Sequence, residues 1–173
     1  WSSLDVVFFS LPNGEAQKLI KKHYNDNNSL KFIDLSADFR ITNYKIYKKI
    51  YNRNHNAKYL IKKSFYSLPE LNNTSIHRFK IIANPGCYPT SIQIPLIPLI
   101  KKNLLILDNI TIDSKSGYSG AGRNLNKNFT HKNLYSSTFA YSPKNHRHIC
   151  EIDQQIYKLT KKKVNFSFNP YLL

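Results

Sequence analysis

The sequence predicts an α/β fold in its first half and a mixed α+β fold in its second half. At the start of the chain, strand-like runs alternate with a helical pattern: "LDVVFFS", then "EAQKLIKK", then "LKFIDLS". Two strands joined by a helix of about ten residues form a parallel βαβ unit. After residue 86 the pattern becomes mixed, so we place a boundary there, between a first domain of residues 1–86 and a second of residues 87–173.

The first half supplies three expected strands. The first covers Val6–Leu11, and a Pro-Asn-Gly turn leads from it into a helix with Ala16, Leu19 and Ile20 at helical spacing. The second strand lies in "LKFIDLSADFR" and the third in "RFKIIANP". Between them, residues 41–63 are rich in Tyr, Asn and Lys and have weak periodicity. We therefore expect an irregular or partly helical excursion in that stretch.

A long apolar run opens the second half. Pro95 and Pro98 lack a backbone N–H and clash with the preceding turn, so we expect a helix here to be kinked or to begin late. Strands are expected in "NITIDSKSG", "SSTFAYSP" and "KVNFSFNPYLL". A helix is expected in "HRHICEIDQQIYKLT", with one apolar face formed by Ile149, Ile152, Ile156 and Leu159.

Composition excludes several classes of protein. With 173 residues, 41% of them hydrophobic, the chain can build a core and is not of the disordered type. The net charge of +16 would suit a nucleic-acid-binding protein. However, only five of the 26 basic residues are Arg and the lysines are scattered, which favours solvated surface lysines over a nucleic-acid site.

Other absences in the sequence point the same way. Two cysteines build neither a disulfide framework nor a metal site. No apolar run reaches the ~18 residues of a membrane span, and the first residues lack the pattern of a signal peptide. We therefore expect a cytoplasmic protein with no metal, no membrane partner and no nucleic-acid partner.

Cys87 is the first candidate for chemistry. It follows an expected strand and precedes an expected helix, in "ANPGCYPT". The unpaired N–H groups and the dipole at a helix start favour a thiolate, and Gly86 allows a tight turn and close approach of a substrate. This placement predicts a nucleophile rather than an inert core cysteine.

Two further stretches carry candidate groups. "SGYSGAGR", at 116–123, is a glycine-rich loop that could present N–H groups to an anion or lie against a flat ring, or could equally be an ordinary loop. In "HRHICEIDQ", His148 and Glu151 are three residues apart, so on a helix they share a face and the acid can orient the imidazole. A neutral His is the usual proton-transfer partner of a thiol nucleophile.

Six stretches occur along the chain in one order: "SLPNGEA", "DLSADFR", "YSLPEL", "ANPGCYPT", "SGYSGAGR" and "HRHICEIDQ". Together they resemble the N-acetyl-gamma-glutamyl-phosphate reductases, NADP-dependent enzymes of arginine biosynthesis that are related to aspartate-semialdehyde dehydrogenase. The resemblance covers almost the whole chain, from Ser10 to about residue 170. It implies a partial Rossmann-like NADP-binding domain in residues 1–86 and a partial catalytic and dimerisation domain of the semialdehyde dehydrogenase type in residues 87–173.

The resemblance implies a mechanism. Cys87 matches the family's catalytic cysteine, whose thiolate would attack N-acetyl-L-glutamyl 5-phosphate and expel phosphate. The thioester would accept hydride from NADPH and collapse to N-acetyl-L-glutamate 5-semialdehyde. His148 would donate and accept the proton, with Glu151 behind it.

It also implies binding residues. Arg123 and Arg147 would hold the substrate's carboxylate or phosphate, since a guanidinium binds either in a fork, and His146 would lie near the anionic group. The full-length family form is expected to be a homo-oligomer. The residues expected to flank the cofactor are Ser10, Leu11, Gly14, Ser36, Gly117, Ser119, Gly120, Ala121 and Gly122.

The sequence departs from the family pattern in four places. It has no GxGxxG turn and stops after "FNPYLL", so we expect a fragment that lacks the N-terminal nucleotide-binding stretch and the C-terminal end. Such a fragment should bind NADPH weakly and be marginally stable. Asn13 and Cys150 stand where the family usually has His and Pro. The alternatives are an aspartate-semialdehyde dehydrogenase-like enzyme, an inactive remnant and, from another class, a basic nucleic-acid-binding protein.

Overall fold

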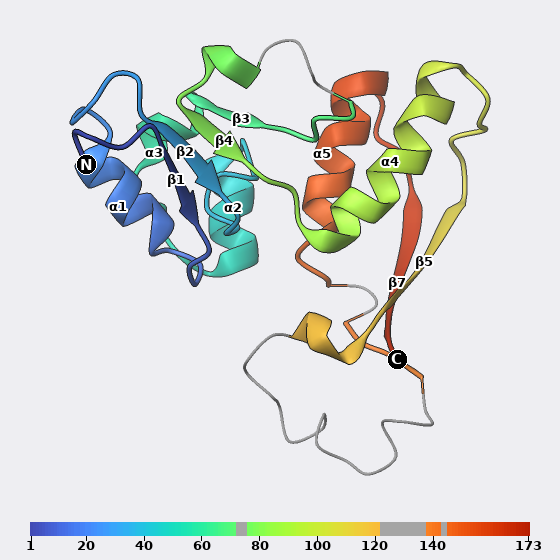
Figure 1. Ribbon diagram of the computed structural model, residues 1–173. Helices are drawn as coiled ribbons and strands as arrows, with labels where there is room; N and C mark the ends of the chain where they lie inside the picture. The colour runs from blue at the N-terminus through green and yellow to red at the C-terminus, as the bar shows by residue number, and fades with distance from the viewer. Residues whose placement is uncertain (72–75, 122–137, 143–144) are drawn as a thin grey trace.

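Two sheets and their helices form the fold of this computed structural model, which describes residues 1–71, 76–121, 138–142 and 145–173 (Figure 1). A four-stranded parallel sheet has the strand order β1-β2-β4-β3, and a three-stranded sheet has the order β5-β7-β6. Helices α4 and α5 lie side by side next to the second sheet (Figure 1). The mixed α/β architecture agrees with the predicted fold class.

The first sheet is built from four short strands. They are β1 (Val6–Phe9), β2 (Lys31–Asp34), β3 (Ser64–Tyr66) and β4 (Ile81–Ala83). The elements between them are α1 (Ala16–His23), α2 (Tyr44–Tyr51), α3 (Lys58–Ile61) and the 3₁₀ turn η1 (Ile76–Arg78). β1 pairs in parallel with β2, and α1 connects them. The expected βαβ unit is therefore confirmed.

One strand of this sheet was not predicted. β3 has three residues and lies in parallel register with β4, Ser64 opposite Ile81. Its sequence, "SFY", is too short to show the alternation that marks a strand. Tertiary pairing with the buried strand β4 determines its conformation, and the stretch before it is helical in α2 and α3, as the expectation of a partly helical excursion allowed.

The second part of the chain contains two long helices and the second sheet. The elements are α4 (Cys87–Lys101), β5 (Ile110–Ser116), the 3₁₀ turn η2 (Tyr118–Ala121), β6 (Phe139–Ala140), α5 (Ile149–Thr160) and β7 (Phe166–Leu172). β7 pairs in parallel with β5 and antiparallel with β6. A core joins α4, α5 and β7 through Tyr88, Ile92, Ile152, Ile156 and Phe168.

The helix after Cys87 was expected to be kinked or to begin late, and the second of these alternatives is wrong. α4 begins at Cys87 and continues through Pro95 and Pro98 as one helix. Both prolines lie on the exposed side, where the carbonyl groups that lose a partner can bond to water. The opposite side of the helix packs against α5 and β7, and this burial stabilises the helix despite the missing N–H groups.

The predicted apolar face of α5 is confirmed in part. Ile152 and Ile156 are buried, and Ile149 packs against the same core, but Leu159 is 38% exposed at the last turn. The fully buried Glu151 lies on α5 beside this face, and sequence periodicity alone would not place a carboxylate there.

Candidate active site

Three turns meet at the carboxyl edge of the parallel sheet. Residues 10–14 follow β1, residues 35–40 follow β2, and residues 84–86 lead from β4 into α4. Because the strands are parallel, their carboxyl ends lie at one edge, which is where open α/β sheets bind ligands. The "SLPNG", "DLSADFR" and "NPGC" stretches of the sequence therefore come together in space.

The turn after β2 is folded around a buried carboxylate. Asp34 accepts hydrogen bonds from the backbone N–H of Ser36 at 2.9 Å and of Phe39 at 3.2 Å. Burial raises the pKa of Asp34 to about 6. These bonds fix the path of "DLSADFR", in which Asp38 contacts the start of α1 and Arg40 contacts the turn after β4.

Asp38 occupies the N-terminus of α1. Its carboxylate accepts from the N–H of Gly14 at 2.7 Å and of Gln17 at 3.0 Å. The side chain of Asn13 donates to Asp38 at 2.8 Å and to Tyr47 Oη at 3.1 Å. Asn13 thus has a clear structural role at a position where the resemblance leads one to expect His. Gly14 has φ +97°, a conformation that favours glycine.

Cys87 is exposed at the first residue of α4, directly after the β4 turn. The predicted strand and helix do flank it. Pro89 has no N–H, and the first N–H with an intrahelical partner is that of Thr90, which donates to Gly86 O at 2.9 Å. Within the described residues, no acceptor faces the N–H groups of Cys87 and Tyr88. These two donors are available to an oxygen atom bound next to the thiol.

Gly86 lets two side chains approach the turn before Cys87. A Cβ atom added to Gly86 would lie 2.6 Å from His148 Nε2 and 3.0 Å from Arg40 Nη1. Any larger residue would displace the imidazole or the guanidinium. The glycine therefore brings His148 against the backbone beside Cys87.

Glu151 is the buried carboxylate of the site. It is fully buried and accepts from the N–H of Gly86 at 3.0 Å, Tyr66 Oη at 3.2 Å and Arg40 Nη1 at 3.4 Å. Burial raises its pKa, while the Arg40 guanidinium and the hydrogen bonds from Gly86 and Tyr66 oppose that rise. Glu151 is thus held where it can orient the site.

His148 faces Glu151, as the three-residue spacing predicts. Its Nε2 lies 3.9 Å from Glu151 Oε1, and its ring is buried. Burial, together with the neighbouring His146, Arg147 and Arg40, lowers the pKa of His148 to about 3, so the imidazole is neutral at pH 7. Its Nδ1 is buried and has no hydrogen-bond partner in the described part of the chain. A neutral imidazole beside a thiol can accept its proton.

His146 lies in an aromatic cluster. Its ring centroid is 4.7 to 5.6 Å from those of His148, Phe168, Tyr88 and Tyr141. Its Nδ1 accepts from the N–H of His148 at 3.2 Å, so a neutral His146 carries its proton on Nε2. Burial and then Arg147 lower its pKa to about 4. Toward an anion, His146 would be a neutral hydrogen-bond donor.

A cleft of about 540 Å³ lies between α2 and the start of α5. Lys49 and Arg147 supply positive charge to its wall, and Asn145, His146 and Cys150 are its other polar residues. Arg147 is exposed. The cleft borders the segment that carries His148.

The residues expected to flank a cofactor fall into two groups. Ser10, Leu11, Gly14 and Ser36 lie at the carboxyl edge of the parallel sheet, with Ser10 and Leu11 exposed. Gly117, Ser119 and Gly120 are exposed at the turn after β5, and Ala121 ends η2. Among the described residues, no atom lies within 4 Å of a Cβ atom added to Gly117. Gly122 and Arg123 lie outside the described residues.

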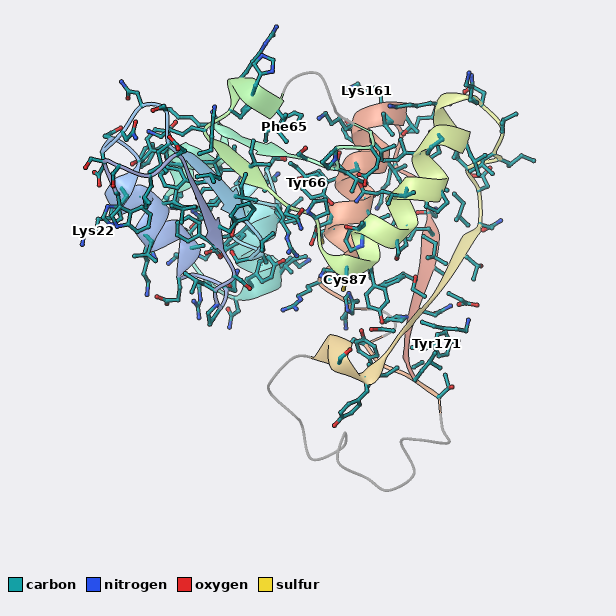
Figure 2. All side chains as sticks on the ribbon, viewed as in Figure 1. Lys22, Phe65, Tyr66, Cys87, Lys161 and Tyr171 are labelled. Carbon is teal, nitrogen blue, oxygen red and sulfur yellow. The ribbon has the colours of Figure 1, made fainter. Side chains whose placement is uncertain are left out.

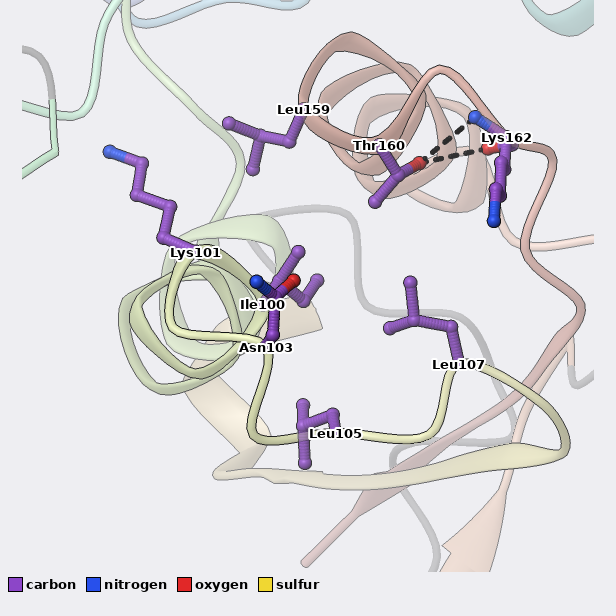
Figure 3. Close-up of a pocket in the computed structure, with 8 residues that line it drawn as sticks. All are labelled: Ile100, Lys101, Asn103, Leu105, Leu107, Leu159, Thr160 and Lys162. Atoms are coloured by element: carbon purple, nitrogen blue, oxygen red, sulfur yellow. Dashed lines mark hydrogen bonds between the residues drawn. The ribbon is translucent and has the colours of Figure 1, made fainter.

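Another hollow, of about 440 Å³, lies at the carboxyl ends of α4 and α5 (Figure 3). Its wall includes Ile100, Asn103, Leu107 and Thr160. α4 has 15 residues, so this hollow is about 20 Å from Cys87 along the helix. It contributes nothing to the Cys87 site.

Within the described ranges, no cluster of three His, Cys, Asp or Glu side chains could hold a metal.

Sequence reasoning missed Arg40, Tyr66 and Gln93, which contact the Glu151 carboxylate or its partner. The signal for Arg40 was present. It ends "DLSADFR" in a chain that otherwise uses Lys for most of its positive charge. Tyr66 begins the "YSLPEL" stretch, but that stretch does not indicate its contact with Glu151. Nothing in the sequence singles out Gln93, because its partner lies on a distant element.

The exposure of the two thiols predicts an order of reaction. Cys87 is exposed, whereas Cys150 is half-buried, and burial raises the pKa of the Cys150 thiol. Iodoacetamide at neutral pH should therefore alkylate Cys87 first, as peptide mass spectrometry of the folded protein would show. The denatured protein, in which both thiols are accessible, is the control. Preferential labelling of Cys150 in the folded state would contradict the assignment of Cys87.

The buried imidazole predicts a pH-dependent stability. The folded-state pKa of His148, about 3, lies below the ordinary value of 6.5, so the unfolded chain binds the extra proton between those values. The stabilisation is complete above pH 6.5 and is lost as the pH falls. Relative to His148→Gln, the free energy of unfolding should fall by up to ~1.4 kcal/mol per pH unit below pH 6.5. Urea unfolding at several pH values measures this free energy, and His77→Gln, which replaces an exposed imidazole, is the control. A difference between wild type and His148→Gln that stays constant from pH 7 to 4.5 would refute the prediction.

Comparisons with known proteins give two family matches. Residues 1–79 match the semialdehyde dehydrogenase NAD binding domain. Residues 87–173 match the semialdehyde dehydrogenase dimerisation domain. No helix in the described part of the chain has the length and apolar character needed to cross a membrane.

Individual relatives agree with these matches. The chain is 42% identical over 173 residues, all of it, to a protein of Arabidopsis thaliana named probable N-acetyl-gamma-glutamyl-phosphate reductase, chloroplastic, and covers 42% of that protein. It is 44% identical over 170 residues to the N-acetyl-gamma-glutamyl-phosphate reductase of Clostridium beijerinckii. That match covers 98% of the chain and 48% of the relative. It is 40% identical over 173 residues, all of it, to that of Alkaliphilus metalliredigens and covers 49% of it. The chain thus spans less than half the length of these relatives.

Proposed function

The chain belongs to the semialdehyde dehydrogenase family, and on that premise we propose that the complete protein reduces an acyl phosphate to a semialdehyde with a nicotinamide coenzyme. The substrate we propose is N-acetyl-L-glutamyl 5-phosphate, the coenzyme NADPH and the pathway arginine biosynthesis. The observation that carries the proposal is the exposed Cys87 at the start of α4, with neutral His148 and buried Glu151 against the preceding turn. The names of the relatives support the choice of substrate.

The proposed chemistry begins with Cys87. His148 takes the thiol proton, and Sγ attacks the carbonyl carbon of the acyl phosphate. The N–H groups of Cys87 and Tyr88 face the negative oxygen that forms. The bond from that carbon to the phosphate oxygen breaks, phosphate leaves, and a thioester remains on Cys87.

His148 then returns its proton. The coenzyme, when bound, supplies the hydride that reduces the thioester. Protonated His148 gives its proton to the thiohemiacetal oxygen and takes it back as the C–S bond breaks, which releases the aldehyde and the Cys87 thiolate. Glu151 keeps the turn and the imidazole in place through the 3.0 Å bond to Gly86 and the facing His148.

The described residues suit one end of the coenzyme. Asp38 takes the N–H groups of Gly14 and Gln17 at the start of α1, so these two donors are not offered to a diphosphate. The exposed segment at Ser10 and Leu11 can instead lie against a flat ring. The exposed Gly117, which has no side chain, can do the same. We propose that these two segments hold the nicotinamide end, with Gly14, Ser36, Ser119, Gly120, Ala121 and Gly122 around it.

Arg147 and His146 are the proposed substrate-binding groups, with Arg123 as a third. Arg147 faces a cleft that also has Lys49 in its wall, which suits a carboxylate.

We further propose that the complete protein is a homo-oligomer, which the match to a dimerisation domain supports. Location in the cytoplasm stays a prediction, and the plant relatives are named chloroplastic.

The test is an assay of the complete protein in the reverse direction, with NADP, phosphate and a semialdehyde. N-acetyl-L-glutamate 5-semialdehyde should give phosphate-dependent formation of NADPH, and NAD should be a poorer acceptor. Aspartate semialdehyde is the matched competitor, because it tests the related aspartate-semialdehyde dehydrogenase activity. Faster turnover of aspartate semialdehyde would replace the proposed substrate, and no phosphate dependence with either would refute the acyl-phosphate chemistry.

A further inference from the structure

Arg40 joins three separate parts of the site. Its Nε donates to Asn84 O at 2.7 Å, in the turn before Cys87, and its Nη2 donates to Leu35 O at 2.7 Å, after β2. Its Nη1 donates to Glu151 Oε1 at 3.4 Å, on α5. The side chain is 10% exposed. The planar, five-donor guanidinium makes all three contacts at once, which the single ammonium of lysine does not.

The other oxygen of Glu151 completes the connection to α4. Glu151 Oε2 accepts from Gly86 N–H at 3.0 Å and from Tyr66 Oη at 3.2 Å. Tyr66 in turn accepts from Gln93 Nε2 at 2.8 Å, and Gln93 lies on the helix that begins at Cys87. Figure 2 labels two ends of these elements, Tyr66 on β3 and Cys87 at the start of α4. The carboxylate is thus held from β3, α4 and the β2 turn.

The carboxylate depends on the charge of Arg40. A fully buried ionised carboxylate is costly unless it is paired. The titratable groups that act on Glu151 are Arg40, Tyr66, His148, Tyr51 on α2 and the Cys150 thiol on α5. Burial and then Glu151 raise the pKa of Tyr66, so it is a neutral donor, and His148 is neutral. Arg40 is the cation among them and favours the ionised form of Glu151.

We propose that Arg40 is a positioning residue for Cys87: its fork holds the Glu151 carboxylate against the N–H of Gly86 and opposite His148. Arg40 acts through Glu151 and the backbone turn. Loss of the fork frees the turn before the thiol and lets the carboxylate take up a proton. The catalytic consequence rests on the proposed function, whereas the structural arrangement does not.

The Gly86 N–H provides a direct readout. Pro85–Gly86 is the one Pro-Gly pair in the printed sequence. Labelling with carbonyl-¹³C proline and ¹⁵N glycine therefore selects the Gly86 amide of this chain in the NMR spectrum. Its proton shift should follow the ionisation of Glu151, since an ionised carboxylate accepts a stronger hydrogen bond. Glu151→Gln should abolish this pH dependence.

The decisive comparison is between two arginines. In Arg40→Gln the midpoint of the Gly86 titration should move to higher pH, because the carboxylate has lost its cation. In Arg78→Gln, which removes an exposed guanidinium on η1, the midpoint should stay where it is. An unchanged or lowered midpoint in Arg40→Gln overturns the proposal. If Arg40→Gln does not fold, Arg40→Lys is tested in its place. A Gly86 titration and a kcat that both equal those of wild type in Arg40→Lys would overturn the proposal.

Kinetics separate positioning from binding. In the complete protein, Arg40→Gln should lower kcat ~10- to 100-fold with little change in KM, since a displaced turn affects the reacting groups and not the substrate contacts. The Arg40→Gln/Glu151→Gln double variant should lose about as much as the worse single variant, because both act through one contact. Fully additive losses would contradict that. If the protein lacks the proposed activity, the proposed function fails, while the Gly86 titration still tests Arg40.

Discussion

Cys87→Ser is expected to abolish acyl-phosphate reduction, lowering kcat by ~10⁴-fold or more. A serine hydroxyl is not ionised at neutral pH and leaves poorly from a tetrahedral carbon, so neither formation nor reduction of the acyl-enzyme proceeds at a useful rate. Cys87 is exposed, so the substitution by an isosteric residue should leave the fold intact. A coupled assay measures kcat, and far-ultraviolet circular dichroism on the same sample measures whether the fold is intact.

Cys150→Ser is the matched control. It removes the other thiol of the chain, which is half-buried on the first turn of α5. Cys150 lines the cleft that Arg147 faces but has no proposed part in the chemistry, and serine keeps a polar group of similar size there, so kcat should stay within about threefold of wild type. If Cys150→Ser were inactive and Cys87→Ser active, the nucleophile would have to be reassigned.

His148→Ala is expected to lower the rate of hydride transfer by ~100-fold or more, the usual scale for the loss of a general acid and base. The reason is the position of the imidazole: it lies against Gly86, is neutral at pH 7 and has a buried Nδ1 without a partner among the described residues. Single-turnover mixing of acyl-enzyme with NADPH isolates this step from binding and product release.

His146→Ala is the comparison for His148→Ala. His146 packs among aromatic rings and accepts a hydrogen bond from the backbone of His148, so its loss should act mainly on KM and on stability. A larger loss of hydride transfer in His146→Ala than in His148→Ala would reverse the two roles.

Much of the fold follows from local patterns. The βαβ start, the strands in the second half and the helix from Ile149 are marked by apolar runs and by helical spacing, which the sequence shows directly. β3 and the full length of α4 were missed for one reason. Pairing with β4, and packing of α4 against α5 and β7, override weak or contrary local signals.

The site divides in the same way. His148 and Glu151 are three residues apart at the start of one helix, so their proximity could be predicted from spacing. Arg40 and Glu151 are 111 residues apart, and their contact depends on how α5 packs at the edge of the parallel sheet. The "DLSADFR" stretch could be recognised as a motif, but the part that its arginine plays is visible only in three dimensions.

The central claim is that Cys87 carries the acyl group, and the most direct measurement is intact mass spectrometry of the complete protein mixed with N-acetyl-L-glutamyl 5-phosphate in the absence of coenzyme. We predict one N-acetylglutamyl group bound per chain, localised to the peptide of Cys87, with release of one phosphate per group. The adduct should be absent from Cys87→Ser and lost on addition of hydroxylamine, which cleaves thioesters. Release of phosphate without an adduct, or an adduct on any residue other than Cys87, would contradict the account.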